Sequence, residues 1–175
     1  MNLVEFQQLS KRTMPFGGEP QNHIEFENML GNYAMGLCGE IIEAYKVRND
    51  KEKLLLELGD VAHYAVGLLS LAKIDIPKPL PYLSVPMNID EMFNRLIFES
   101  GEILEHAKKV IYHRHEFEAW RIESCLLIAQ SVSKLAFRNH STLGLVLVKN
   151  IDKLKTRYPE KFSVEDSIAR KDVQQ

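Results

Sequence analysis

The sequence predicts an all-α protein, a bundle of amphipathic helices around one shared hydrophobic core. Apolar residues recur at spacings of three and four along most of the 175 residues, which is the periodicity of a helix with one buried face. Alternating runs rich in Val, Ile and Thr and bounded by turn residues, which would predict strands, are missing from the sequence. A chain of this length with 45% hydrophobic residues can form one domain with a sizeable core.

The first half of the chain predicts a short helix, a loop and a helical hairpin. The short helix is indicated by three apolar residues at helical spacing: Leu3, Phe6 and Leu9. Two prolines and two glycines within residues 14–20 exclude a regular element, so a loop is expected there. Long helices should follow over residues 24–48 and 51–73, because Asn49 and Asp50 break the apolar pattern and Asp50 can cap the second helix.

The second half predicts another helical hairpin. Prolines are concentrated in residues 77–86, which indicates an extended linker because each proline removes a hydrogen-bond donor and restrains its predecessor. Helices are expected over residues 90–112 and 116–137, on either side of a tip at residues 113–115. The protein should therefore contain two packed hairpins joined by one linker.

A closing helix and a tail complete the prediction. Ser141 is suited to cap the closing helix, and Pro159 should end it because proline cannot continue the hydrogen-bond ladder. Residues 160–175 are polar and are expected to lie over the surface or to fray.

Composition excludes several classes of function. The 22 basic and 24 acidic side chains give a net charge of −2, so the chain lacks the basic field that attracts a nucleic-acid polymer. Cys38 and Cys125 lie within apolar helical patterns and form no disulfide framework, which fits a reducing cytoplasm. The amino terminus lacks an apolar signal core, and no uninterrupted apolar stretch approaches the roughly 18 residues of a membrane span. We expect a cytoplasmic protein without a membrane segment.

Two acidic pairs lie on the two helices of the first hairpin. Glu40 with Glu43, and Glu57 with Asp60, are each spaced three apart, so the carboxylates of a pair share one helix face. If the turn centres on residues 49–50, the inner members lie ~10 Å and the outer members ~15 Å from it, at the helical rise per residue. All four carboxylates are therefore expected to meet at one level.

Such a cluster predicts a divalent cation. Four carboxylates on a largely apolar helix pair would repel one another and resist burial unless a cation or protons compensated them. Oxygen ligands suit Mg²⁺ or Mn²⁺, and Mg²⁺ commonly bridges carboxylates to substrate phosphates. The alternative is a solvated acidic face that pairs with Lys46, Lys51 and Lys53. The small and apolar neighbours of the acids favour the cation.

The motifs around these acids resemble a known family. The stretch GLCGEIIE of residues 36–43, followed by ELGD at 57–60, is similar to the GL-x-GE-x-x-E and ELGD signature of the MazG-like proteins in the all-α NTP pyrophosphatase superfamily. Phe6-Gln7 and Arg12-Thr13 resemble the first helix of phage-type members, and residues 150–162 resemble their closing motif N-x-x-KL-x-x-RYP-x-x-F. The match covers roughly residues 1–75 and 142–170, and three motifs in order are more specific than one.

The resemblance implies a Mg²⁺-dependent bundle enzyme that cleaves a nucleoside triphosphate between its α and β phosphates, giving the monophosphate and pyrophosphate. The residues implied to hold the metal, and with it to activate a water molecule, are the four acids: Glu40, Glu43, Glu57 and Asp60. Lys153 and Arg157 would neutralise phosphate oxygens, with a hydrogen bond from Asn150. The alternative for these three is a solvated polar stripe. Which acid acts as the base stays open.

Residues 76–141 depart from the family pattern and resemble a degenerate copy of the first hairpin. Gly101-Glu102 and Glu105 stand where Gly39-Glu40 and Glu43 stand, but the expected partner of Glu102 falls at Leu126, so a second site is incomplete. The alternative is that Glu102 and Glu105 are exposed acids that pair with two neighbouring lysines: Lys108 and Lys109. We expect a single all-α domain over residues 1–175 with three parts: a first hairpin with the metal site (1–75), a degenerate second hairpin (76–141) and a closing helix with its tail (142–175).

Internally duplicated relatives such as the dimeric-type dUTPases suggest a pseudo-dimer by analogy, and a homodimer or larger homo-oligomer is a further expectation. Two other functions compete with the hydrolase. One is a non-catalytic helical protein that uses the same fold for binding or assembly. The other is a di-iron protein, because His63 follows Asp60 at the spacing of a di-iron ligand pair. A second motif of that kind on a matching helix is missing, so His63 is expected to be an ordinary helix residue.

Overall fold

The computed structural model describes residues 1–77 and 87–169, and within these ranges the chain forms α-helices and short 3-10 turns but no strand. The all-α prediction is therefore confirmed for the described part of the chain. The helices are α1 (Leu3–Ser10), α2 (His23–Lys46), α3 (Lys51–Leu71), α4 (Ile89–His113), α5 (Ser124–Arg138), α6 (Leu143–Arg157) and α7 (Val164–Ala169). The predicted linker, apart from Pro77, lies outside the described residues.

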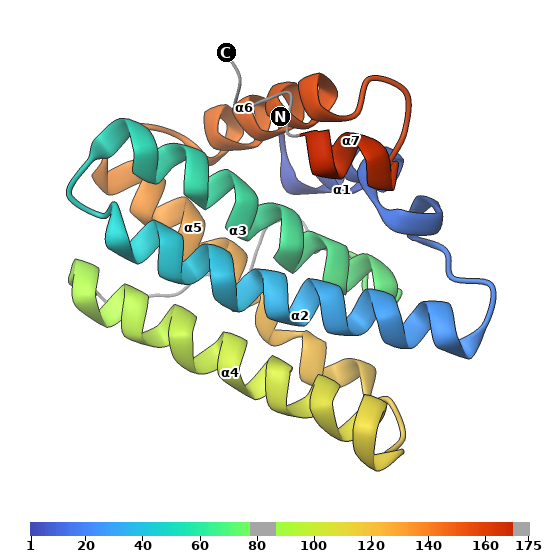
Figure 1. The fold of residues 1–175 in the computed structure, drawn as a ribbon. Coiled ribbons are helices and arrows are strands. Elements are labelled where there is room, and N and C mark those ends of the chain that lie inside the picture. Colours follow the sequence, from blue (N-terminus) through green and yellow to red (C-terminus); the bar gives the residue numbers. More distant parts are fainter. Residues whose placement is uncertain (78–86, 170–175) are drawn as a thin grey trace.

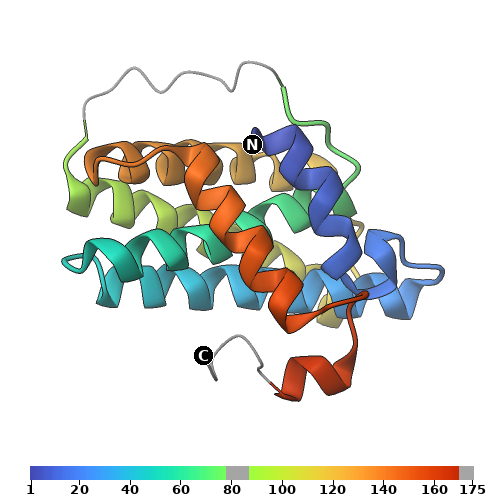
Figure 2. The same cartoon turned by 90° about the horizontal axis from the view of Figure 1, so that it is seen from above.

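Four long helices form a closed bundle. Helix α2 packs against α3 and α4, while α5 packs against both α3 and α4, so the two hairpins lie side by side (Figure 1). Helices α1 and α6 contact each other and α3, and Figure 2 shows α6 crossing obliquely over the bundle. Helix α3 is thus covered from several sides, and it carries one of the two acidic pairs.

The first hairpin forms where the sequence predicts it. The side chain of Asn22 caps α2 by accepting from the backbone N–H of Glu25, and Asp50 caps α3 by accepting from Lys53. Gly36 lets the two helices approach closely, since a Cβ atom at this position would lie 2.2 Å from the ring of Tyr64. The close contact fixes the depth of the acids on the two facing helices.

The second hairpin differs from the prediction at its turn. Helix α5 begins at Ser124 rather than at 116, and a 3-10 turn at Ala119–Ile122 precedes it. Arg114 ends α4 in the left-handed region at φ 59°, and Phe117 then packs edge-on against Phe26 at 4.9 Å between ring centroids. This aromatic contact with a distant helix holds residues 115–118 out of a helix, although their own pattern favours one.

The remaining differences are small. The cap of α6 is Thr142 rather than Ser141, and the helix ends at Arg157, two residues before Pro159. The expected loop at residues 14–20 contains a 3-10 turn at Pro15–Gly18. The described part of the polar tail includes the short helix α7, which has no buried residue and so lies over the surface, one of the two expected arrangements.

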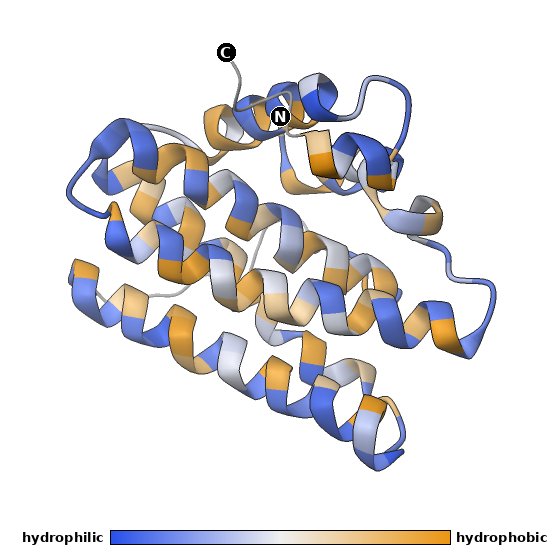
Figure 3. Cartoon of the chain, in the orientation of Figure 1, coloured by the Kyte–Doolittle hydropathy of each residue, from blue (hydrophilic) through white to orange (hydrophobic). Residues whose placement is uncertain are grey.

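Apolar and polar residues alternate along each helix, with the apolar stripes turned toward the bundle (Figure 3). Helix α3 is the most apolar, and by length and composition alone it could cross a membrane. The sequence-based test missed α3 because Glu57, Asp60 and His63 interrupt its apolar run. In the fold, 78% of its most apolar window is buried inside the molecule.

Candidate metal centre

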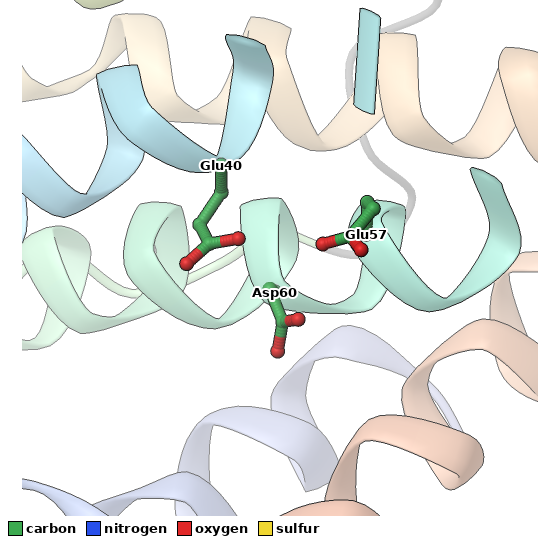
Figure 4. A group of neighbouring side chains, drawn as sticks. All are labelled: Glu40, Glu57 and Asp60. Atoms are coloured by element: carbon green, nitrogen blue, oxygen red, sulfur yellow. The ribbon is translucent and has the colours of Figure 1, made fainter. Parts of the chain in front are cut away.

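Three of the four predicted acids converge. Glu40 comes from α2, and Glu57 and Asp60 come from α3; each offers an oxygen atom, and these atoms all lie within 4.8 Å of one another. Figure 4 shows Glu40 reaching from α2 toward α3, on which Glu57 and Asp60 lie close to it. Among the described residues, this is the one group of three or more His, Cys, Asp or Glu side chains with such convergence.

Glu43 does not join this group. Its side chain is 53% exposed and forms an ion pair with Lys46 at 2.8 Å, although it lines the same cleft. All four acids predicted to meet at one level line the same cleft, but Glu43 is not among the three whose oxygen atoms converge. Glu43 lies one turn nearer to the end of α2, where solvent and a lysine three residues further along can reach it. For Glu43 the structure therefore shows the alternative arrangement, a solvated acid paired with a lysine.

Helix α6 covers Asp60 with two polar side chains. The Lys153 ammonium lies 2.5 Å from one carboxylate oxygen of Asp60, and the Asn150 amide donates to the other at 2.8 Å. Gly59 permits this approach, because a Cβ atom there would lie 2.9 Å from the Cβ atom of Asn150. Asn150 and Lys153, which were predicted to bind substrate, thus contact the acid cluster itself.

The cluster shifts the protonation of its members. Burial raises the pKa of Glu40 to about 7, and the negative charges of Asp60 and Glu57 add to the rise, while Lys153 and Arg157 oppose it. Burial also raises the pKa of Glu57, and Asp60 adds to this shift. Both shifts favour the protonated carboxyl, and a bound cation would oppose them by stabilising the charged form.

These carboxylates border a cleft of about 730 Å³. One end of the cleft, the acidic end, is lined by the three converging acids, by Glu43 and by two basic residues, Lys153 and Arg157. Its neutral end consists of uncharged side chains near the start of α2 and in the preceding loop: Thr13, Pro15, Phe16, Asn28, Met29, Asn32 and Tyr33. The cleft therefore offers charge at one end and uncharged surface at the other.

His63 lines the cleft between these ends. Its Nδ1 atom is buried and has no hydrogen-bond partner in the part of the chain that the structure describes. Burial lowers the pKa of His63 to about 4, so the ring is neutral at pH 7. His63 does not join the group of converging acids.

The donor set fits a hard divalent cation. It consists of carboxylate oxygens without thiolates, which suits Mg²⁺ or Mn²⁺. Burial, with a smaller contribution from the neighbouring carboxylates, raises the pKa values of Glu40 and Glu57, so a nearby cation would favour their charged forms. The residues present thus match the group that the acid pattern predicts.

The second hairpin shows no comparable centre among its described residues. Glu105 pairs with Lys108 at 2.5 Å and with Lys109 at 3.6 Å, and Glu102 is exposed. Glu123 is also exposed and stands at the start of α5. The pairing with lysines, which was the alternative to a second site, is the arrangement found for Glu105.

Sequence reasoning missed the neutral end of the cleft. Asn28 and Asn32 are four residues apart and so share a face of α2, but nothing in their spacing connects them with Glu40. The position of Phe16 had no signal either, because only the path of the loop between α1 and α2 brings it to the cleft.

Comparisons with protein-family models, with curated proteins and with solved structures found no match to this chain. The function is therefore inferred from the fold and from the geometry of the site.

Proposed function

We propose that the protein is a Mg²⁺-dependent, MazG-like nucleoside triphosphate pyrophosphohydrolase, which converts an NTP or dNTP and water to the monophosphate and pyrophosphate. The observation that carries this proposal is the convergence of Glu40, Glu57 and Asp60 at one end of a nucleotide-sized cleft that also holds Lys153 and Arg157. Carboxylates next to basic side chains suit a metal-bound polyphosphate, since neither set alone balances the charge of both ions.

Each residue has a distinct part in this proposal. Glu40, Glu57 and Asp60 would hold the metal, with Glu43 at the rim. The metal, when bound, would polarise the phosphate and lower the pKa of a water molecule. Lys153 and Arg157 would bind phosphate oxygens, and Asn150 keeps Asp60 oriented through its 2.8 Å hydrogen bond. Lys153 holds Asp60 in the metal-free protein, so it would exchange this contact for one with phosphate.

The test is the release of pyrophosphate from a panel of NTPs and dNTPs, with Mg²⁺, with Mn²⁺ and with EDTA. We expect metal-dependent pyrophosphate and monophosphate, without free phosphate or diphosphate. Glu57→Gln should abolish this release, whereas the exposed Glu123→Gln serves as the matched control. If no triphosphate is cleaved under any metal condition, the hydrolase proposal fails and the non-catalytic binding or assembly protein replaces it.

A further inference from the structure

Helix α7 borders the cleft without being packed into the molecule. Ser167 of α7 and Phe162, which precedes the helix, line the same cleft as the acid cluster. The helix packs against α6 but has no buried residue, and Figure 2 shows it standing apart from the bundle beyond the end of α6. Elements with few buried apolar contacts move at low cost in free energy, so α7 can change its distance from the cleft.

The connection from α6 to α7 is, by contrast, firmly held. The Arg12 guanidinium donates to three successive backbone carbonyl oxygens, those of residues 158–160. The backbone N–H of Phe162 donates in turn to the carbonyl oxygen of Arg12 at 3.3 Å. The rings of Tyr158 and Phe162 lie 5.4 Å apart between their centroids. These contacts fix the connection and leave Ser163 as the point about which α7 can turn.

Helix α7 is capped by its own preceding residue. The Ser163 hydroxyl oxygen accepts from the backbone N–H of Asp166 at 3.0 Å, and the hydroxyl donates to the Asp166 carboxylate at 2.9 Å. The backbone N–H of Ser167 donates to the carbonyl oxygen of Ser163 at 3.1 Å. Such capping satisfies the first N–H groups of a helix locally, so α7 can move as a unit.

The face of α7 that carries Ser167 is otherwise apolar. Val164, Ser167 and Ile168 share this face, because they are spaced by three and four residues along the helix. Val164 is 60% exposed and Ile168 is 78% exposed, although Ser167 between them lines the cleft. Phe16 lines the same cleft, and its ring is 53% exposed. The two aliphatic side chains and the ring would lose apolar surface to water by packing against one another, which favours closure.

The acid cluster makes closure of this helix dependent on a ligand. Covering Glu40, Glu57 and Asp60 would remove water from charged carboxylates, which costs free energy unless their charge is compensated. A bound cation supplies that compensation, and a polyphosphate held by the cation gives the helix a further surface to contact. The ligand therefore interacts more favourably with the closed arrangement than with the open one, which is the condition for a ligand to shift such an equilibrium.

We propose that α7 is a hinged cover of the cleft, which turns about Ser163 and packs Val164 and Ile168 against Phe16 when a metal-bound polyphosphate occupies the acidic end. This inference rests on the proposed function for the class of ligand. It goes further by assigning to α7 the retention of the ligand and the exclusion of bulk water from its phosphates.

Hydrogen exchange measured by mass spectrometry tests this movement without turnover. The probes are the α,β-methylene analogues of ATP, GTP, CTP, UTP and dTTP, which cannot be hydrolysed between the α and β phosphates. We expect the amides of residues 164–169 to exchange about tenfold more slowly with Mg²⁺ and a saturating analogue than in EDTA, because closure shields them from solvent. The amides of residues 133–138, at the end of α5, should exchange at the same rate in both conditions.

Substitutions on α7 distinguish a cover from a passive neighbour of the ligand. Val164→Ala combined with Ile168→Ala removes the apolar contacts and favours the helix. Calorimetric titration should show about fivefold or more weaker binding of the analogue, as the loss of apolar burial predicts, and the slower exchange should be lost. Phe137→Ala, at an exposed apolar position on α5, is the matched control and should change neither quantity. All three side chains are exposed, so the variants keep the fold.

A double-mutant cycle identifies the surface on which α7 docks. Phe16→Gly removes the ring and tolerates the left-handed backbone at this position, and it is combined with Ile168→Ala. If the two side chains pack together in the closed arrangement, the combined loss of affinity is smaller than the product of the single losses by a factor of about 2 or more.

Three outcomes would overturn the cover. They are single losses that simply multiply, an analogue that binds without slowing exchange over residues 164–169, and the absence of binding by every analogue. Release of pyrophosphate from the triphosphates decides separately whether the proposed function stands.

Discussion

The thiol of Cys38 lies 3.5 Å from the backbone carbonyl oxygen of Ser100, at the contact between α2 and α4. An alignment of Gly39-Glu40 with Gly101-Glu102 also pairs Cys38 with Ser100. Two equivalent residues that touch are what a two-fold axis between the hairpins would produce. The contact is what the proposed internal duplication would produce; among the described residues, the convergent acid cluster lies in the first hairpin.

The first prediction concerns the unequal roles of the two copies. If the proposed function holds, Glu40→Gln should lower kcat for pyrophosphate release by about 100-fold or more, because it would remove a ligand of the proposed metal. Glu102→Gln combined with Glu105→Gln should leave kcat within about twofold, since these acids are solvated and Glu105 already pairs with lysines. Steady-state kinetics at saturating Mg²⁺ provide the measurement. Similar losses in both variants would contradict a single competent site.

The second prediction is that Glu40 destabilises the metal-free protein at alkaline pH. Its pKa is about 7 in the fold against 4.5 ordinarily, so its stabilising contribution is complete below pH 4.5 and is lost as the pH rises through 7. In EDTA, Glu40→Gln should raise the free energy of unfolding by about 1–2 kcal/mol at pH 8, allowing for solvent screening, and change it little at pH 4.5. Urea denaturation at both pH values checks this; a benefit that does not depend on pH would argue against it.

The third prediction concerns His63 and has the opposite sign. Burial lowers its pKa from 6.5 to about 4, so its stabilising contribution is complete above pH 6.5 and is lost as the pH falls toward 4. Relative to His63→Gln, the wild-type protein should lose about 2–3 kcal/mol between pH 7 and pH 4. Urea denaturation gives this difference, and an NMR titration of the His63 ring gives the pKa directly. A ring that titrates near 6.5 would refute the prediction.

The fourth prediction concerns the contact between Lys153 and Asp60. Lys153→Met leaves Asp60 without its cationic partner and should lower the free energy of unfolding by about 1–3 kcal/mol in EDTA. Added Mg²⁺ should recover more of this stability in the variant than in the wild type, because the cation replaces the lost charge. Thermal unfolding with and without Mg²⁺ measures both effects. The control is Lys155→Met, whose exposed ammonium lies 3.9 Å from Asp152 and should matter little.

The fifth prediction concerns Arg12, which ties the segment after α6 to the start of the chain. Its guanidinium donates to the carbonyl oxygens of Tyr158, Pro159 and Glu160 at 2.7–3.1 Å. Arg12→Ala should cost about 1–3 kcal/mol of stability and should raise KM more than it lowers kcat, because Tyr158 lines the cleft. Arg138→Ala, which removes one carbonyl contact elsewhere, is the control. Equal effects of the two changes would count against a tie that shapes the cleft.

The sequence predicts correctly those helices in which the capping residues stand at the ends of the apolar pattern. Helices α2, α3 and α4 appear within two residues of their expected bounds, because caps such as Asp50 coincide with the apolar period. The predicted start of α5 was wrong, because Phe117 packs against Phe26, a residue far away in the sequence. Local pattern cannot reveal such a contact.

The candidate site could likewise be predicted only in part. Spacing from the hairpin turn brings Glu40, Glu57 and Asp60 together, because helical rise fixes their depth. Spacing does not decide side-chain direction, and Glu43 instead turns to Lys46. Phe16 was missed for another reason, since its position depends on a strained turn rather than on any periodicity.

The cleft is formed by two segments that lie far apart in the sequence, one near the start of the chain and one at α6. Thr13 and Arg157 line the same cleft, and Arg12 bonds to carbonyl groups almost 150 positions later, at a separation of 148 for Glu160. Contacts of such high sequence separation form late in folding, because loop closure must precede them. During synthesis on the ribosome, the acid cluster would therefore exist before its cover, and a nascent chain that stops before α6 would expose these carboxylates without a pocket in which to hold a nucleotide.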